Sequence, residues 1–309
     1  MLSGISFRRL TFVEEDALMK PEKDYRIGRR RWLPRLLSVL VVGLCAAPVL
    51  ASDGVLEINQ VKVIKAGGFP YVIGRVGSYR LTSNLYVTIA ADPKNTNAIQ
   101  VDAPDVTIDL NGFSILGPAV CSGNPVTSCI NIGTGVGVNS FESVVVRNGT
   151  IQGMGSAGIA LRGGSVERIH AIGNGNDGIY GAEVVRNCVS EVNGQTGFFI
   201  PGGLITGSRA TGNKADGIFV ATEATVIGNS SSFNGRNGIT FGNIGVSNST
   251  GVVSNNTATG NTSWGLSLAV NTVGFVGNVL YNNNGGIANP QVVGGFNLGQ
   301  NLCNAALCP

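Results

Sequence analysis

The phrase Asn174-Gly-Asn-Asp-Gly178-Ile, which consists of Asn, three residues, Gly and an apolar residue, recurs down this chain. The glycine returns about every 20 residues from Gly158 to Gly286, with one longer step between Gly238 and Gly265. A period of about 20 residues indicates a solenoid in which similar coils stack on one another. The other copies are Asn193-Gly-Gln-Thr-Gly197-Phe, Asn213-Lys-Ala-Asp-Gly217-Ile, Asn234-Gly-Arg-Asn-Gly238-Ile and Asn261-Thr-Ser-Trp-Gly265-Leu, with Asn282 and Gly286-Ile closing the series.

Each repeat contains short runs in which apolar and small polar residues alternate, such as 184–189 and 217–220. This alternation is typical of a half-buried β-strand, and the Gly and Asn residues between the runs favour tight turns because both tolerate positive φ. We therefore predict an all-β fold, a single-stranded right-handed parallel β-helix of about nine or ten coils with a cap at each end. Neighbouring coils are expected to pair about 4.8 Å apart.

The chain divides into four segments. Residues 1–51 are predicted to be a secretory leader, with Met19 as an alternative start, because Arg29 to Arg35 precede an apolar run and a small-residue cleavage site. Residues 52–105 are expected to form an N-terminal cap with first strands at 61–64 and 85–89. Residues 106–289 form the β-helix and residues 290–309 a C-terminal cap. No segment beyond the leader is apolar enough to span a membrane, so we expect a secreted or periplasmic monomer.

The basic excess of the chain belongs to the leader. Residues 1–51 carry 9 of the 21 Lys and Arg residues and 5 of the 18 Asp and Glu residues. The remainder, with 12 basic and 13 acidic residues, is nearly neutral. We therefore expect no nucleic-acid partner, since such a partner requires a basic surface.

Stacked coils bring equivalent residues into columns. Five asparagines at one turn are predicted to form a structural ladder in which side-chain amides hydrogen-bond along the stack. The apolar residue after each repeated glycine should point inward and build the core. The asparagines are Asn174, Asn193, Asn213, Asn234 and Asn261, and the inward residues are Ile159, Ile179, Phe198, Ile218, Ile239 and Leu266.

The cysteines fit an exported protein. Cys121 and Cys129 flank a short insertion, and Cys303 and Cys308 lie near the end of the sequence, so each close pair is predicted to form a disulfide loop. Cys188 remains as a buried free thiol. We expect no metal and no cofactor, because the chain has one histidine and no cysteine spacing typical of zinc sites.

An outward row of aromatic residues is the candidate binding surface. Two positions after each repeated glycine, the chain has Tyr180, Phe199 and Phe219 in three successive coils. Exposed apolar rows mark contact surfaces, and aromatic rings can stack on sugars. The residues before the glycines include Asp177, Asp216 and Trp264, which we expect to add polar and aromatic contacts to a polysaccharide. A purely structural stack is the competing interpretation.

Two carboxylates are the candidates for catalysis. Asp177 and Asp216 lie two coils apart, about 9.6 Å at strand spacing, near the upper limit for the carboxylates of an inverting glycosidase. The sequence shows no environment that would separate their pKa values, as acid–base catalysis requires. We therefore identify no catalytic residue, and these two aspartates remain candidates.

The phrase Val106-Thr-Ile-Asp-Leu-Asn-Gly-Phe-Ser-Ile-Leu-Gly117, followed by the Asn/Gly coils, resembles bacterial β-helix repeat proteins of the pectate-lyase-like superfamily. The resemblance covers roughly residues 80–289 and implies the fold. Members of the superfamily include polysaccharide lyases, glycoside hydrolases, epimerases and adhesins, but their catalytic motifs are absent here. We expect an exported protein that contacts polysaccharide or another surface polymer. The alternatives are a polysaccharide lyase or glycoside hydrolase, and a structural or adhesive spacer without a specific ligand.

Overall fold

A computed structural model describes residues 54–141, 143–242, 249–268 and 272–309. The predicted leader therefore lies outside the described residues, and so does part of the longer step between Gly238 and Gly265. Among the described residues, no helix is both long and apolar enough to cross a membrane.

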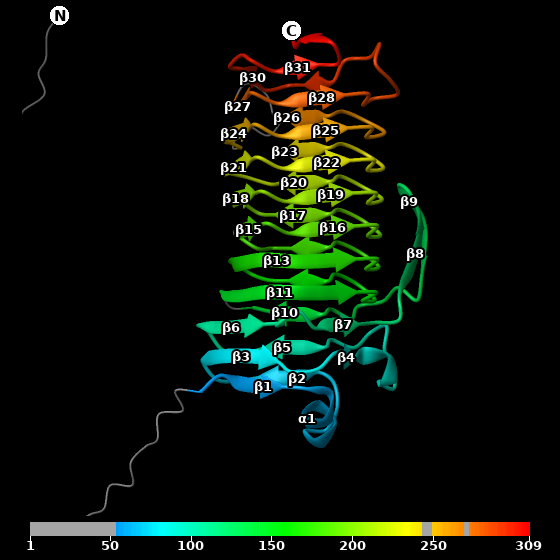
Figure 1. Ribbon diagram of the computed structural model, residues 1–309, viewed down its shortest axis with the longest axis vertical. Helices are drawn as coiled ribbons and strands as arrows, with labels where there is room; N and C mark the ends of the chain where they lie inside the picture. Colours follow the sequence, from blue (N-terminus) through cyan, green and yellow to red (C-terminus); the bar gives the residue numbers. More distant parts are fainter. Residues whose placement is uncertain (1–53, 142, 243–248, 269–271) are drawn as a thin grey trace, which may run out of the picture. The chain divides into compact units, whose positions relative to one another are not determined.

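The described chain is a right-handed parallel β-helix, which confirms the predicted fold (Figure 1). One side of the stack is a sheet of ten short strands that pair in parallel. Its residues alternate between the core and the outer surface, as in Ile218-Phe-Val, where Ile218 and Val220 are buried. These strands are β2 (Tyr71–Ile73), β5 (Ile99–Val101), β10 (Val138–Ser140), β12 (Ile159–Ala160), β14 (Ile179–Tyr180), β17 (Phe198–Ile200), β20 (Ile218–Val220), β23 (Ile239–Phe241), β26 (Leu266–Leu268) and β29 (Val292–Val293).

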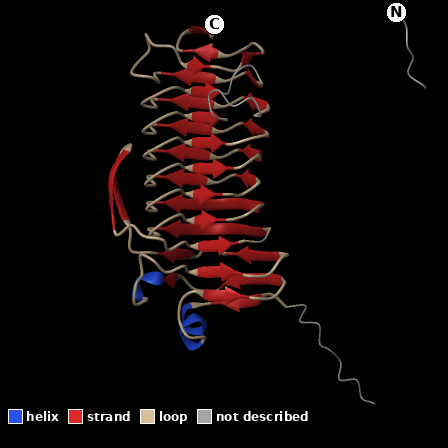
Figure 2. Cartoon of the chain, turned by 180° about the vertical axis from the view of Figure 1, so that it is seen from behind, coloured by secondary structure: helices blue, strands red, loops and turns tan. Residues whose placement is uncertain are grey.

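Two further columns of strands close each coil, and all of their pairings along the stack are parallel (Figure 2). Strands β11 (Val144–Gln152) and β13 (Gly164–Ile172) run through both columns. The first column also has β1 (Leu56–Ile58), β3 (Gly77–Leu81), β6 (Val106–Asp109), β15 (Val184–Arg186), β18 (Gly203–Thr206), β21 (Ala224–Ile227), β24 (Gly251–Ser254), β27 (Val273–Val276) and β30 (Phe296–Asn297). The second also has β4 (Leu85–Tyr86), β7 (Ser114–Leu116), β16 (Val189–Glu191), β19 (Arg209–Thr211), β22 (Ser230–Ser232), β25 (Thr257–Thr259), β28 (Val279–Tyr281) and β31 (Leu302–Cys303).

The core is a continuous apolar column inside the coils. All six residues predicted to follow the repeated glycines inward, from Ile159 to Leu266, are fully buried. Phe198 and Phe241 are the largest fully buried side chains among the described residues. No coil buries its own apolar face, so each stabilises its neighbours.

The N-terminal segment differs from the prediction. Residues 61–64 belong to helix α1 (Gln60–Lys65), not to a strand, and the Asn59 side chain caps it by accepting a hydrogen bond from the Lys62 N–H at 2.9 Å. Of the strand expected at 85–89, only β4 is extended, and Val87–Ile89 forms a 3₁₀ turn, η1.

The stack also extends beyond the predicted boundaries at both ends. Strand β1 pairs with β3, and β3 with β6, so parallel coils begin well before residue 106. At the other end β29, β30 and β31 pair with the preceding coil, and β32 (Ala306–Leu307) turns back against β31. Both terminal segments were predicted as caps because they lack the repeated phrase, yet their backbones continue the same pairing.

A hairpin lies beside the stack, formed by β8 (Val120–Gly123) and β9 (Val126–Ile130) (Figure 1). The Cys121–Cys129 disulfide joins its strands, and Cys303–Cys308 closes the last hairpin, so both predicted disulfides are confirmed. The Val126 N–H donates to the Gly212 carbonyl at 2.9 Å, which ties the hairpin to the turn of a distant coil. Cys188 is a free, buried thiol.

Candidate functional site

The outer surface of the ten-stranded sheet carries the candidate site. Strand register places Asn139, Ala160, Tyr180, Phe199 and Phe219 in one outward column of successive coils. The column therefore passes from an amide to a methyl group and then to three aromatic rings. Tyr180 is 43% exposed, whereas Phe199 and Phe219 are half-buried.

The three rings stack on one another along the axis of the solenoid. The ring centroids of Tyr180 and Phe199 are 4.9 Å apart, as are those of Phe199 and Phe219, with interplanar angles of 24° and 18°. Rings in such a stack turn their faces toward each other and their edges to solvent. Tyr180 ends the stack, and its other side adjoins Ala160, which is too small to cover it.

The space beside Tyr180 is an open groove of ≈ 480 Å³. Its floor comes from Asn139, Ala160 and the two adjacent rings. Its wall comes from residues that follow the strands of the ten-stranded sheet: Phe141, Arg162, Glu183 and Pro201.

Two opposite charges face this groove from neighbouring coils. The Arg162 guanidinium carbon lies 4.8 Å from the centroid of the Phe141 ring, a cation–π contact that holds the side chain over the wall. Glu183 is exposed, and its carboxylate lies beside Gly163. These two described side chains form no ion pair with each other, so both keep hydrogen-bonding capacity for a ligand.

Asp177 and Asp216 do not line the groove. Their side chains are 7% and 2% exposed, which contradicts the expectation that they stand open beside the rings. The Asp177 carboxylate accepts the Thr196 N–H at 2.9 Å, and Asp216 accepts the Asn237 N–H at 3.0 Å. Burial raises the pKa of Asp177 to about 6. Both aspartates hold the next coil in place, because the residue before each repeated glycine turns toward that coil.

Trp264 occupies the same column as these aspartates. Its backbone N–H donates to the Asn237 side chain at 3.1 Å, and the residue is half-buried. It is not among the residues that line the groove. Of the six residues predicted to contact carbohydrate, the groove includes Tyr180 and Phe199. Phe219 stacks on Phe199 outside the groove.

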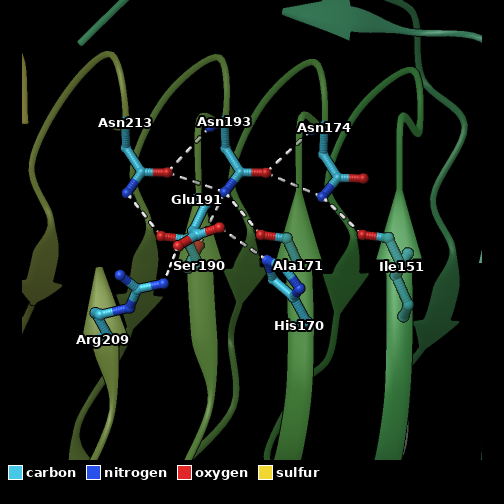
Figure 3. Close-up of polar contacts among 9 residues, drawn as sticks. All are labelled: Ile151, His170, Ala171, Asn174, Ser190, Glu191, Asn193, Arg209 and Asn213. Atoms are coloured by element: carbon cyan, nitrogen blue, oxygen red, sulfur yellow. Dashed lines mark hydrogen bonds and ion pairs between the residues drawn. The ribbon is translucent and has the colours of Figure 1, made fainter. Parts of the chain in front are cut away.

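The predicted asparagine column is a hydrogen-bonded ladder (Figure 3). The Asn174 amide donates to the Asn193 side-chain oxygen at 3.0 Å, and Asn193 donates to Asn213 at 2.9 Å. The same side-chain oxygens accept the backbone N–H of the preceding coil, at 3.0 Å for both Asn174 and Asn193. The ladder continues through Asn234 and Asn261.

The ladder ends differently from the prediction. Asn261 donates to Asn283, not Asn282, and Asn283 donates to Gln291. Ile287 is 60% exposed, and Val292 takes the register position after Leu266. The last turn is longer than the others, so the repeated phrase misassigned the asparagine by one residue and the inward apolar residue by five.

Sequence reasoning missed a second ladder at the corner between the two other strand columns. Asn229 donates to Asn256 at 3.0 Å, Asn256 to Asn278 at 3.1 Å, and Asn278 to Asn301 at 2.9 Å. At both corners a residue with positive φ, such as Gly173 or Gly228, precedes the inward amide. The sequence did carry a signal for the second ladder, because dipeptides of the type Gly-Asn or Asn-Asn occur twice in two of the later coils.

A polar cluster lies on the outer face of the second strand column, close to the first ladder (Figure 3). His170 Nε2 lies 3.1 Å from a Glu191 carboxylate oxygen, and Arg209 pairs with the other oxygen of the same carboxylate. The three side chains satisfy one another. In the part of the chain that the structure describes, no group of three or more His, Cys, Asp or Glu residues is placed to hold a metal ion.

Comparisons with known proteins give two similar structures. The chain is similar to the Dettilon tailspike protein gp208, with 16% identity and a TM-score of 0.39 over 80% of this chain and 63% of that one. It is also similar to the A-module of the Azotobacter vinelandii mannuronan C-5 epimerase AlgE4, with 15% identity and a TM-score of 0.37 over 77% and 70% of the two chains. No family model and no curated protein matches the sequence. The chain spans less than two thirds of the tailspike chain.

Proposed function

We propose that this protein binds a polysaccharide through the groove beside Tyr180, and that it does so as an exported, non-catalytic protein. Two disulfides fit an oxidising compartment such as the periplasm or the cell exterior. The single observation that carries the proposal is the position of Tyr180 at the end of the aromatic stack, next to Ala160.

A sugar ring fits this position for a physical reason. The C–H groups of a pyranose form a weakly apolar face, which packs well against an aromatic face but poorly against ring edges. The row has two end rings: Phe219 adjoins Thr240 on its outer side, whereas Tyr180 adjoins only the small side chain of Ala160. The binding position is therefore one ring wide, and the groove continues it along the adjacent turns.

The polar residues of the groove suit the hydroxyl groups of the same sugar. Arg162 donates hydrogen bonds, Glu183 accepts them, and the Asn139 amide does both. Because the guanidinium and the carboxylate balance each other, the groove favours a sugar unit without net charge. A uronate would gain from Arg162 and lose to Glu183.

Binding is favoured over hydrolysis by the number of carboxylates. A glycosidase needs two that flank the scissile bond, and among the described residues of the groove Glu183 is alone in carrying one. Asp177 and Asp216 are committed to backbone hydrogen bonds in the interior.

The test is retention of the mature chain, residues 52–309, on a panel of immobilised polysaccharides. We expect Tyr180→Ala to lower retention about five- to thirtyfold, because a stacked, desolvated contact of about 1–2 kcal/mol is removed. Tyr86→Ala is the matched control, since Tyr86 is 45% exposed and lies far from the groove in sequence. Circular dichroism must show both variants folded. Equal retention of Tyr180→Ala and wild type on every bound polymer would sink the proposal, and product release from the panel would point to an enzyme instead.

A further inference from the structure

A second hollow adjoins the groove beside Tyr180, around the edge of the coil. Its volume is ≈ 520 Å³, close to the ≈ 480 Å³ of the groove, and it lies on the outer face of the first strand column, along β6, β11, β13 and β15. Glu183 lines both depressions, so one side chain stands between them. Both volumes are typical of ligand sites, which measure roughly 300–1,000 Å³.

Strand register explains the open space around Glu183. In its column of successive coils, Glu183 follows Gly164 and precedes Gly203, because β15 pairs with β13 on one side and with β18 on the other. Both glycines have positive φ, and a Cβ on Gly164 or Gly203 would lie 2.1 Å or 2.2 Å from a backbone oxygen. Neither position accepts a side chain without a backbone shift. No side chain of its own column therefore covers Glu183 on either side.

The lining of the second hollow suits the hydroxyl groups of sugars. The hydroxyl groups of Thr107, Ser143 and Ser165 can donate and accept hydrogen bonds, and the carboxylates of Asp105 and Glu183 accept them. None of the described lining residues is Lys, Arg or His. A carboxylated or sulfated sugar would meet like charge there without a cation to offset it. The hollow therefore favours neutral sugar units.

The hollow is long, and its two carboxylates lie at opposite ends. Asp105 comes directly before β6, and three coil steps lead from β6 through β11 and β13 to β15, which Glu183 precedes. Three steps are about 14 Å at strand spacing. This separation exceeds that of the carboxylates in a glycosidase, so the hollow offers contacts along a ligand and no catalytic pair.

A third hollow adjoins Glu183 on its other side, and it matches a sugar less well. It is lined mainly by glycine and apolar residues, among them Pro201 and Leu204. The hydroxyl group of Thr222 donates to the Pro201 carbonyl at 2.7 Å, so this donor is already used.

We propose that the second hollow is a subsite for the polymer that binds beside Tyr180. At least two linked units of a neutral polysaccharide then occupy the two depressions, with Glu183 between them. The inference rests on the proposed function, because the unit at Tyr180 anchors the polymer. Once that unit is bound, the following units are held close to the hollow, and they bind there without the cost of a second association.

The experiment fills the hollow with an indole. Ser165 faces outward, since the next residue, Val166, is buried, so Ser165→Trp blocks the hollow without entering the core. On the polysaccharide panel, we expect retention to fall roughly tenfold, while binding of the monosaccharide from the retained polymer stays within about twofold of wild type. Thr225→Trp is the matched control, because Thr225 faces outward in the same column, three coils further on, and lines neither depression. Thr107→Trp, near the far end of the hollow, is a second blocking variant should circular dichroism show Ser165→Trp unfolded.

The outcomes separate this inference from the proposed function. If both blocking variants retain the polymer as Thr225→Trp does, the second subsite is overturned, and the groove proposal stands as long as Tyr180→Ala loses retention. Equal losses of monosaccharide and polymer binding in the blocking variants would place the damage in the groove and overturn the subsite. Preferred retention of a uronate or sulfated polymer over every neutral one would also overturn it. Absence of retention on every polymer overturns both proposals.

Discussion

The two corners that carry the asparagine ladders make the same turn of the chain with different residues. At the first corner, a residue with positive φ is followed by an inward asparagine from Asn174 to Asn283 without interruption. At the second corner the inward positions hold Ile169, Cys188 and Ser208 before the asparagines begin at Asn229. The turn at each corner thus depends on the residue with positive φ. An inward asparagine side chain is needed only where the corner buries backbone N–H or C=O groups that no other group satisfies.

The difference shows what an asparagine adds to a corner. Its side-chain oxygen accepts two N–H groups of one neighbouring coil, while its NH₂ group donates to carbonyl and amide oxygens. Ser208 replaces this with a single oxygen, which accepts the Cys188 N–H at 3.1 Å. The first corner is therefore cross-linked through paired amides from Asn174 onward, whereas the second has paired amides only from Asn229 onward.

The largest effect is expected from breaking the first ladder at its centre. Asn213→Leu leaves the Asn193 N–H without its acceptor in the interior and removes the side-chain hydrogen bonds of Asn213 to Asn193, Ser190 and Asn234. The unpaired N–H costs about 1–3 kcal/mol and each lost side-chain hydrogen bond about 1 kcal/mol, so we expect a loss of about 3–5 kcal/mol in the free energy of unfolding. Urea unfolding followed by circular dichroism measures it, with Asn255→Gly beside the second ladder as a neutral control. If Asn256→Leu in the second ladder costs far less than Asn213→Leu, the two corners are not equivalent.

A smaller effect is expected at Asp177, in the column of residues that precede the repeated glycines. Burial raises its pKa from 3.8 to about 6, so the folded protein holds the proton more tightly than the unfolded chain does. This contribution to stability is complete below about pH 4 and is lost as the pH rises through 6. Asp177→Asn keeps an oxygen for the Thr196 N–H and removes the charge. At pH 7 we expect it to stabilise the protein by up to about 3 kcal/mol.

The measurement for Asp177→Asn is the urea midpoint as a function of pH. The difference between variant and wild type should grow between about pH 4 and pH 7. Asn237 already fills the equivalent place in a later coil, so the amide fits the position. A difference that does not change with pH would show that the carboxyl group carries no raised pKa.

The smallest effect is expected from extending the second ladder backwards. Ser208→Asn places an amide next to Asn229, where its oxygen can accept the Cys188 N–H and its NH₂ can donate to the Asn229 oxygen. One added buried hydrogen bond stabilises by about 1 kcal/mol. Thermal unfolding measures the difference in stability between Ser208→Asn and Ser208→Ala, which removes the acceptor. Should Ser208→Asn be less stable than wild type, the early second corner is too tightly packed for an amide.

The fold was predictable because the repeated phrase marks residues whose conformation is locally determined. Gly and Asn accept positive φ, and alternation sets which residues point inward, so Ile179 and Phe198 were assigned correctly without tertiary information. The second ladder was not predicted because Cys188 and Ser208 interrupt its pattern of asparagines. Helix α1 escaped because it is a single short segment outside the repeat, with a cap at Asn59 as its main signal.

By itself, the sequence determined the stacking of the coils and the row formed by Tyr180, Phe199 and Phe219, because a fixed period places equivalent residues in register. Only the tertiary structure decided what these residues present to solvent. Asp177 and Asp216 turn inward because the neighbouring coil offers them backbone N–H groups. Tyr180 keeps an uncovered side because the next residue in its column is Ala160. Exposure depends on the neighbours above and below, which lie a whole coil away in the chain.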